Sequence, residues 1–226
     1  MIPWVELDRA QVPDGGGELR LMRRGDEFSI MAGSISLMTS RRTGSEETLA
    51  TIGCARIKNR SKPRVLIGGL GVGFTLRAAL DALPADAAVV VSELVPAVVK
   101  WARGPMAEIF GTSLSDPRVT IEETDVAKVI AAAPSAYDAI LLDVDNGPEG
   151  LTRKANDKLY DQNGLRSARA ALRPRGILAV WSSGPDPRFT QRLSRSGFDV
   201  EEVKARANGA RGGAWHMIWV ASRPER

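Results

Sequence analysis

The chain has 226 residues, 43% of them hydrophobic, and a formal net charge of +4. This length and composition are enough for a full hydrophobic core and predict one main domain with a small appendage. The weak positive charge does not indicate a nucleic-acid partner, and the single cysteine, Cys54, excludes an internal disulfide framework and a cysteine-rich metal site.

The N-terminal part combines short apolar pieces with glycine-containing breaks. Over residues 17–39 this pattern predicts a small antiparallel β appendage. Apolar residues then recur at near-helical spacing in the segment 45–59, with Ser45 as a suitable N-cap. We therefore expect the appendage to occupy residues 1–44 and the main domain residues 45–226.

In the main domain, short apolar runs alternate with helical patterns. Continuous Val, Ile and Leu in the middle runs predicts a mostly parallel sheet covered by helices on both faces. The last two runs are joined by a glycine-rich segment and predict an antiparallel edge hairpin. The expected strands span about 64–68, 87–93, 118–123, 138–144, 176–183, 198–205 and 214–222. The expected helices span about 73–83, 95–103, 125–133, 153–173 and 186–196.

A glycine-rich loop follows the first of these strands. The segment VLIGGLGVGFTLR places Gly69, Gly71 and Gly73 between the strand and the head of a helix. Glycine permits a tight turn and close approach of a ligand, and the helix N-terminus offers free N–H groups. A dinucleotide motif needs glycine where Phe74 stands, whereas G-x-G-x-G is typical of sites for a nucleoside-amino acid such as S-adenosylmethionine. Close packing alone is the alternative explanation.

Acidic residues follow the next three strands. Glu93 ends the second strand, where an acid can accept hydrogen bonds from both ribose hydroxyls. Asp125 follows the third strand and could either accept from an adenine amino group or cap the next helix. Asp143 and Asp145 end the fourth strand. Because the carboxyl ends of parallel strands share one crevice, we expect one ligand site, although Asp143 and Asp145 could instead only form a turn.

Four spaced motifs resemble the spermidine synthase family, the aminopropyltransferases. They are VLIGGLGVGFTLR, SELVPAVVKWAR, RVTIEETDVAKVI and YDAILLDVDNGPEG. The resemblance implies a Rossmann-like sheet of the class I methyltransferase type. It also implies that Glu93 holds the ribose, that Asp125 contacts adenine and that Asp143 positions and deprotonates the attacking amine. Glu47 matches an acid on the helix that carries part of the family's substrate site.

The sequence departs from the family pattern in several stretches, including Val95, where the family has an acid two places after the ribose ligand. Val72 stands where the glycine loop of the family has an acid that holds the ammonium of the aminopropyl group. Asp145 and Asn146 replace the second half of D-S-S-D-P, and Ser45-Glu46-Glu47 replaces Tyr-Gln-Glu. A loop acid would repel the carboxylate of intact S-adenosylmethionine, so Val72 favours the intact donor over its decarboxylated form.

On this basis we expect a transferase that moves a methyl group from S-adenosylmethionine to an amine or hydroxyl acceptor, leaving S-adenosylhomocysteine. Asp143 is the expected base, with Asp145 or Asn146 as its orienting partner and both in the acceptor site. The alternative is a divergent polyamine aminopropyltransferase that uses decarboxylated S-adenosylmethionine and leaves methylthioadenosine. A further alternative is a non-catalytic nucleoside-binding protein.

Several other residues around the expected site have two alternative roles each. The polar segment 147–165 is expected to fold over the substrate, with Tyr160 either facing the ligand or anchoring a helix against the core. Trp181 or Ser182, at the end of the fifth strand, could line the acceptor pocket. We expect His216, the only histidine, to lie in the core or on an edge strand far from the glycine loop.

The expected partner is a small-molecule acceptor, and the family resemblance implies a homodimer. No metal site is expected, because the sequence has no cluster of histidines or cysteines. No apolar run reaches the length of a signal peptide or a membrane span, so we expect a cytoplasmic location.

Overall fold

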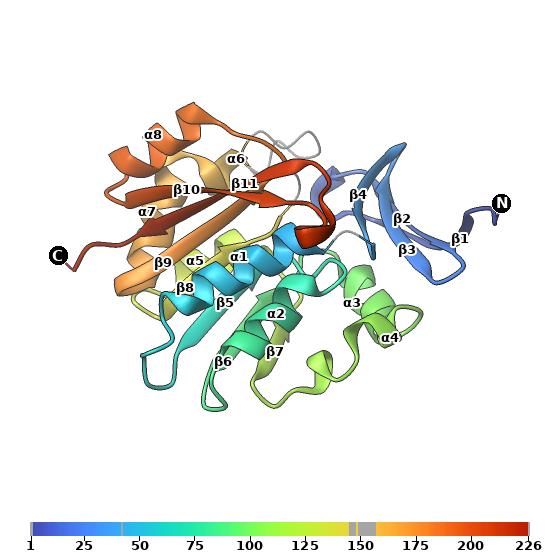
Figure 1. The fold of residues 1–226 in the computed structure, drawn as a ribbon, viewed down its shortest axis with the longest axis horizontal. Helices are drawn as coiled ribbons and strands as arrows, with labels where there is room; N and C mark the ends of the chain where they lie inside the picture. Colours follow the sequence, from blue (N-terminus) through green and yellow to red (C-terminus); the bar gives the residue numbers. More distant parts are fainter. Residues whose placement is uncertain (1, 42, 145–147, 149–156, 226) are drawn as a thin grey trace.

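The computed structural model describes residues 2–41, 43–144, 148 and 157–225, which form two sheets with flanking helices (Figure 1). Within these residues, the N-terminal sheet is antiparallel and has the strand order β1-β2-β3-β4. Its strands are β1 (Val5–Gln11), β2 (Glu18–Arg24), β3 (Glu27–Ala32) and β4 (Ile35–Thr39). It lies beside α3 (Pro96–Arg103) and α4 (Ala107–Phe110) of the larger unit.

The main sheet has the strand order β10-β11-β9-β8-β5-β6-β7 in the described residues. Its strands are β5 (Arg64–Gly68), β6 (Ala88–Ser92), β7 (Val119–Glu122), β8 (Tyr137–Leu142), β9 (Leu172–Ser182), β10 (Asp199–Arg206) and β11 (Trp215–Ser222). The strands β5 to β9 pair in parallel, whereas β11 is antiparallel to both β9 and β10. The chain order reverses between β5 and β8, where open α/β sheets bind their ligands.

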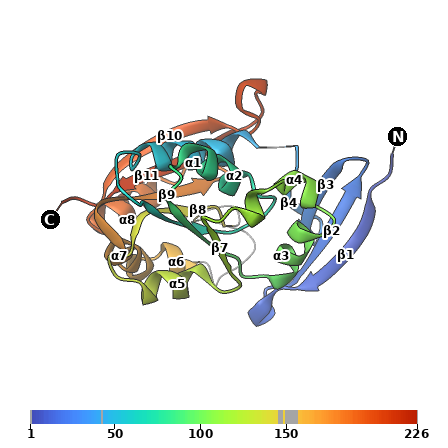
Figure 2. The ribbon, with the colours of Figure 1, turned by 90° about the horizontal axis from the view of Figure 1, so that it is seen from below.

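Helices cover both faces of the main sheet, as Figure 2 shows. The helices α1 (Gly44–Ala55) and α2 (Phe74–Ala82) lie on one face, and α5 (Val126–Ala132) and α7 (Gln162–Ala171) lie on the other. Two further helices are α6 (Asp157–Tyr160) and α8 (Pro187–Arg195). Alternate residues of β5 pack into two different hydrophobic clusters: Val65 and Ile67 belong to one cluster, and Leu66 belongs to the other. Because both faces are covered, the central strands β5, β6 and β8 are apolar along most of their length.

The predicted fold class is confirmed: a mostly parallel α/β sheet with an antiparallel edge and a small N-terminal β unit. The structure adds β1, which the sequence analysis missed. Val5 and Leu7 of β1 are exposed, so this edge strand lacks the buried alternate face by which strands are recognised. The predicted N-cap is wrong. Thr43 precedes the helix without a capping bond, and Ser45 lies inside it, buried.

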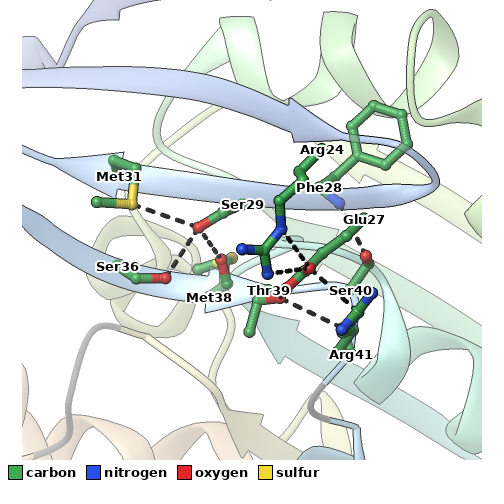
Figure 3. Close-up of polar contacts among 10 residues, drawn as sticks. All are labelled: Arg24, Glu27, Phe28, Ser29, Met31, Ser36, Met38, Thr39, Ser40 and Arg41. Atoms are coloured by element: carbon green, nitrogen blue, oxygen red, sulfur yellow. Dashed lines mark hydrogen bonds and ion pairs between the residues drawn. The ribbon is translucent and has the colours of Figure 1, made fainter. Parts of the chain in front are cut away.

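The outer polar contacts of the N-terminal sheet join β2, β3 and β4 (Figure 3). Glu27, only 8% exposed, forms ion pairs with Arg24 at 2.7 Å and Arg41 at 3.1 Å, and Thr39 donates a hydrogen bond to it. A buried carboxylate needs such partners because desolvation alone would disfavour its charge. These contacts hold β4 against β3, and β4 carries two residues of the cavity described next, Leu37 and Met38.

Candidate functional site

The glycine loop is held by two neighbouring strands. Gly69 donates its N–H to Ser92 O at 2.8 Å, and Asp143 donates its N–H to Gly68 O at 3.0 Å. Gly69 has a φ of +90°, and a Cβ there would lie 2.4 Å from the carbonyl oxygen of Asp143. Glycine is therefore required at this position both by the backbone conformation and by the approach of the chain after β8.

A cavity of about 110 Å³ lies between this loop and the N-terminal sheet. The sheet and the turn after β1 contribute an apolar wall made by Val12, Leu19, Ile30, Ala32, Leu37 and Met38. The opposite wall contains Gly69, Gly71, Glu93, Asp125 and Asp143. The carboxyl ends of β5, β6, β7 and β8 thus meet in one chamber, as the sequence predicted. Its combination of apolar walls and a few polar groups is typical of small-molecule sites.

Glu93 and Asp125 both line this cavity and both also bind backbone N–H groups. The two carboxylate oxygens of Glu93 each accept a hydrogen bond at 2.9 Å, one from Leu70 N and one from Val95 N. Burial raises the pKa of Glu93, and these backbone bonds oppose the rise. Asp125 caps α5 by accepting from Ala127 N at 2.8 Å. A carboxylate oxygen has two lone pairs, so neither role prevents a second bond to a ligand.

Asp143 lies where this chamber meets a second, smaller cavity of about 30 Å³. Thr75, in the first turn of α2, donates a hydrogen bond to Asp143 Oδ2 at 2.6 Å. Burial raises the pKa of Asp143 to about 6, and the Thr75 bond acts in the opposite direction. A carboxylate with such a pKa exchanges protons near neutrality, as a general base must.

Glu46 is the acid that the sequence analysis overlooked. It lines the second cavity together with Val72, Asp143 and Trp181. Burial raises the pKa of Glu46 to about 7, and the negative charge of Asp143 adds to the rise. The predicted substrate ligand Glu47 is instead exposed and does not line either cavity.

Helical phase explains why Glu46 rather than Glu47 faces the site. Glu46 precedes Leu49 and Ala50, both fully buried, by three and four residues, so these side chains share a face of α1. Glu47 shares its face with the exposed Thr51. The periodicity of the buried positions was therefore a signal for Glu46 that the family correspondence obscured.

Of the remaining predicted residues, some lie near the site and others do not. Asp145 and Asn146 are outside the described residues. Tyr160 is 1% exposed and packs edge-to-face against Phe189, with ring centroids 5.7 Å apart, which favours the anchoring role over ligand contact. Trp181 lines the second cavity, as expected for an acceptor-pocket residue.

The position expected for His216 is wrong. Its ring lies 4.8 Å from that of Trp181, centroid to centroid, and its Nδ1 is 2.9 Å from Ser45 Oγ. The pairing of β11 with β9 brings His216 to the carboxyl end of β9, against Trp181, and Trp181 lines the second cavity together with the glycine loop. This register was not readable from the sequence.

The raised pKa of Glu46 predicts a pH-dependent stability. Between the ordinary pKa of 4.5 and about 7, the folded chain binds this proton more tightly than the unfolded chain, so the free energy of unfolding falls as pH rises. We expect Glu46→Gln to be more stable than wild type at pH 8, by on the order of 2 kcal/mol, with no difference at pH 4. Urea denaturation at both pH values measures this, and exposed Glu47→Gln is the matched control. Equal stability of Glu46→Gln and wild type at pH 8 would contradict the assigned burial.

Two further findings concern the described residues only. No group of three His, Cys, Asp or Glu side chains in them is placed to hold a metal ion. None of their helices combines the length and apolar character needed to cross a bilayer.

The chain is similar in sequence to known polyamine aminopropyltransferases. No family model matches the chain. A polyamine aminopropyltransferase of Mycobacterium tuberculosis is 26% identical over 172 residues, covering 74% of this chain and 31% of that protein. Polyamine aminopropyltransferase 2 of Pseudomonas aeruginosa is 32% identical over 124 residues, covering 53% and 33%. The chain thus spans about a third of the length of these curated relatives.

Solved structures show the same fold. The spermidine synthase of Thermotoga maritima has a TM-score of 0.76 at 18% identity, covering 98% of this chain and 74% of that chain. A spermidine synthase in complex with the transition state analogue AdoDATO gives 0.75 at 18% identity, with coverage of 98% and 73%. The O-methyltransferase TomG of Streptomyces achromogenes, in complex with SAM, gives 0.56 at 16% identity and covers 79% of each chain.

These comparisons favour the aminopropyl alternative of the sequence analysis over its first expectation, methyl transfer, because the sequence relatives are named aminopropyltransferases. The resemblance seen in the four motifs is confirmed. The chain is similar in sequence to polyamine aminopropyltransferases, and it has the Rossmann-like α/β fold seen in the solved spermidine synthases and in the O-methyltransferase.

Proposed function

We propose that the protein is an aminopropyltransferase that binds decarboxylated S-adenosylmethionine and transfers its aminopropyl group to an amine. The observation that carries this proposal is a pair of acids in the second cavity, Glu46 and Asp143. Asp143 also lines the larger cavity beside the glycine loop. Two acids at this end attract the ammonium and sulfonium of the decarboxylated donor and repel the carboxylate of the intact one.

The residues present fit such a donor. The apolar cavity suits the adenine ring, and Asp125 lies at this cavity to accept from the adenine amino group. Glu93 lies beside the glycine loop to accept from the ribose hydroxyls. Glu46 and Asp143 would hold the aminopropyl end.

The neutral loop residue Val72 was the reason to expect methyl transfer. The structure weakens that argument, because Glu46 reaches from α1 into the cavity that Val72 lines. An acid lost from the loop is thus replaced by an acid from a different element. Selectivity depends on the total charge around the ligand, and not on the element that supplies it.

When bound, the decarboxylated donor supplies a propyl carbon made electrophilic by the neighbouring sulfonium. Asp143 takes a proton from the ammonium of the acceptor, which frees the nitrogen lone pair for attack. The Thr75 hydroxyl fixes the orientation of this carboxylate. The walls from the N-terminal sheet exclude water and hold donor and acceptor in line, which is the main requirement of a displacement at carbon.

Calorimetric titration with the two donors tests the proposal. We expect tighter binding of decarboxylated than of intact S-adenosylmethionine, and an affinity for the decarboxylated form that rises several-fold from pH 6 to pH 8. The rise follows because the cation binds best once Glu46 and Asp143, with pKa values of about 7 and 6, have lost their protons.

The control variants are Glu46→Gln, which should lose most of the donor preference, and exposed Glu47→Gln, which should keep it. Methylthioadenosine formed with a panel of amines would support aminopropyl transfer. Preference for the intact donor, with S-adenosylhomocysteine as product, would restore methyl transfer. Binding with no product from any amine would support the non-catalytic alternative, and binding of neither donor would end the proposal. A polyamine-like acceptor, a homodimer and a cytoplasmic location stay predictions.

A further inference from the structure

Three side chains form a hydrogen-bonded chain that leads from the second cavity toward the edge of the main sheet. Ser45 Oγ lies 2.7 Å from Glu46 Oε2 and 2.9 Å from His216 Nδ1. Ser45 is fully buried, whereas His216 is partly exposed on β11. Glu46 lines the cavity that also contains Asp143. The chain therefore joins the acids of the candidate site to a side chain within reach of solvent.

The hydroxyl of Ser45 carries one proton, so the two hydrogen bonds must run in the same direction. When Glu46 is ionised, Ser45 donates to Glu46 and accepts from His216 Nδ1–H. When Glu46 is protonated, it donates to Ser45, and Ser45 donates to an unprotonated His216 Nδ1. Converting the second arrangement into the first moves one proton from Glu46 to the imidazole without breaking either heavy-atom contact.

We propose that Ser45 and His216 form a proton exit for the candidate active site, with His216 as a positioning residue that acts through Ser45 on Glu46. This inference rests on the proposed function. Aminopropyl transfer turns a primary ammonium and a sulfonium into a secondary ammonium and a neutral thioether: a C–N bond forms, the C–S bond breaks with its electron pair going to sulfur, and one proton is released. Asp143 takes that proton and passes it to Glu46, which lines the same cavity, and the exit then carries it through Ser45 to His216 and on to water.

The groups that surround the exit suit this role. Burial raises the pKa of Glu46 to about 7, and the negative charges of Asp143 and Glu47 add to the rise, so Glu46 holds and releases a proton near neutral pH. Around His216, β9 contributes the neutral ring of Trp181, 4.8 Å away. On the paired strand β10, Ala205 lies opposite His216 and is flanked by Lys204 and Arg206, and the guanidinium of Arg206 stacks on Trp215 at 3.8 Å. Histidine is the side chain that ordinarily exchanges protons in this pH range.

Nuclear magnetic resonance on the whole chain tests the exit without any assay of turnover. His216 is the only histidine, so its imidazole nitrogen signals are assigned without mutagenesis. In the wild type we expect a hydrogen-bonded Nδ1 whose signal changes in two steps with pH, one from His216 and one from Glu46. In Glu46→Gln we expect a single step, with the midpoint lower by about one pH unit because the neighbouring negative charge is gone.

Ser45→Ala should likewise give a single step, because it removes the hydroxyl between the two groups. Thr51→Ala, which removes an exposed hydroxyl from the same helix, should behave as wild type. Identical His216 signals and midpoints in wild type, Ser45→Ala and Glu46→Gln would overturn the proposal.

A second experiment tests whether turnover uses the exit. His216→Gln should bind decarboxylated S-adenosylmethionine as wild type does, form methylthioadenosine roughly tenfold more slowly with an altered pH profile, and recover with added imidazole. Unchanged rates and pH profile would overturn the role in turnover. If wild type forms no product with any amine, the proposed function fails, while the resonance experiment still decides whether the exit exists.

Discussion

Replacing Asp143 by asparagine is expected to lower the rate of methylthioadenosine formation by about 10²- to 10⁴-fold, the range measured when a general base is removed. Asparagine keeps the shape of the side chain and can still accept the bond from Thr75, but it cannot take a proton. Donor affinity should fall only several-fold, because the variant loses one negative charge at the aminopropyl end while Glu46, the apolar cavity, Glu93 and Asp125 are untouched. Single-turnover kinetics combined with calorimetry separates the two effects.

Thr75→Val is the matched control for this prediction. It removes the 2.6 Å hydrogen bond to Asp143 and leaves the carboxylate in place, so we expect a rate loss well below that of Asp143→Asn. It should also raise the pKa of Asp143 further, because that bond opposes the effect of burial. Full activity in Asp143→Asn would show that Asp143 is not the base and would leave Glu46 as the candidate.

Replacing Gly69 by alanine is expected to abolish donor binding and to lower the free energy of unfolding by about 2–4 kcal/mol. Part of this cost comes from the φ of +90°, which a residue with a side chain rarely adopts. The rest comes from the new methyl group, which would lie 2.4 Å from the carbonyl oxygen of Asp143 and would push the ends of β5 and β8 apart. Urea denaturation and calorimetry measure the two losses.

Gly17 offers a control with nearly the same backbone conformation. Its φ is +88°, and no atom lies within 4 Å of a Cβ added there. Gly17→Ala should therefore show only the conformational cost, about 1 kcal/mol, and should bind the donor as wild type does. Similar losses in the two variants would mean that backbone strain, and not the contact with Asp143, makes Gly69 necessary.

Local patterns in the sequence were sufficient for the main sheet. Apolar runs such as 64–68 became strands with the predicted bounds because both faces of the sheet are buried, and burial produces the pattern. The strand β1 was missed because an edge strand pairs through its backbone and leaves side chains such as Val5 exposed. The position of the glycine loop and of the acids after the strands was predictable because each directly follows a strand in the sequence, and parallel strands bring their carboxyl ends to the same edge of the sheet.

The acceptor end of the site was less predictable because it depends on contacts between distant segments. Ser45 and His216 are 171 residues apart in the chain and meet only through the register of β11 with β9. Val72 favoured the intact donor in the sequence analysis, but a loop motif carries no information on the charge of Glu46, which comes from another helix and lines the same cavity. Family correspondence selected Glu47, whereas the phase of the helix selects Glu46.

The cavity wall supplied by the N-terminal sheet has a consequence for recombining this protein with its relatives. One wall of the cavity comes before residue 44 in the chain, from Val12, Ile30 and Met38, and the opposite wall comes after it, from Glu93 and Asp143. A crossover at that boundary therefore joins the N-terminal wall of one parent to the opposite wall of another. Without the wall that the N-terminal sheet supplies, the main sheet would offer the nucleoside an open groove instead of an enclosed cavity. Donor affinity is thus expected to depend on both segments together. A chimaera that keeps the motifs but takes its N-terminal sheet from another parent would fold, but it would bind the donor poorly.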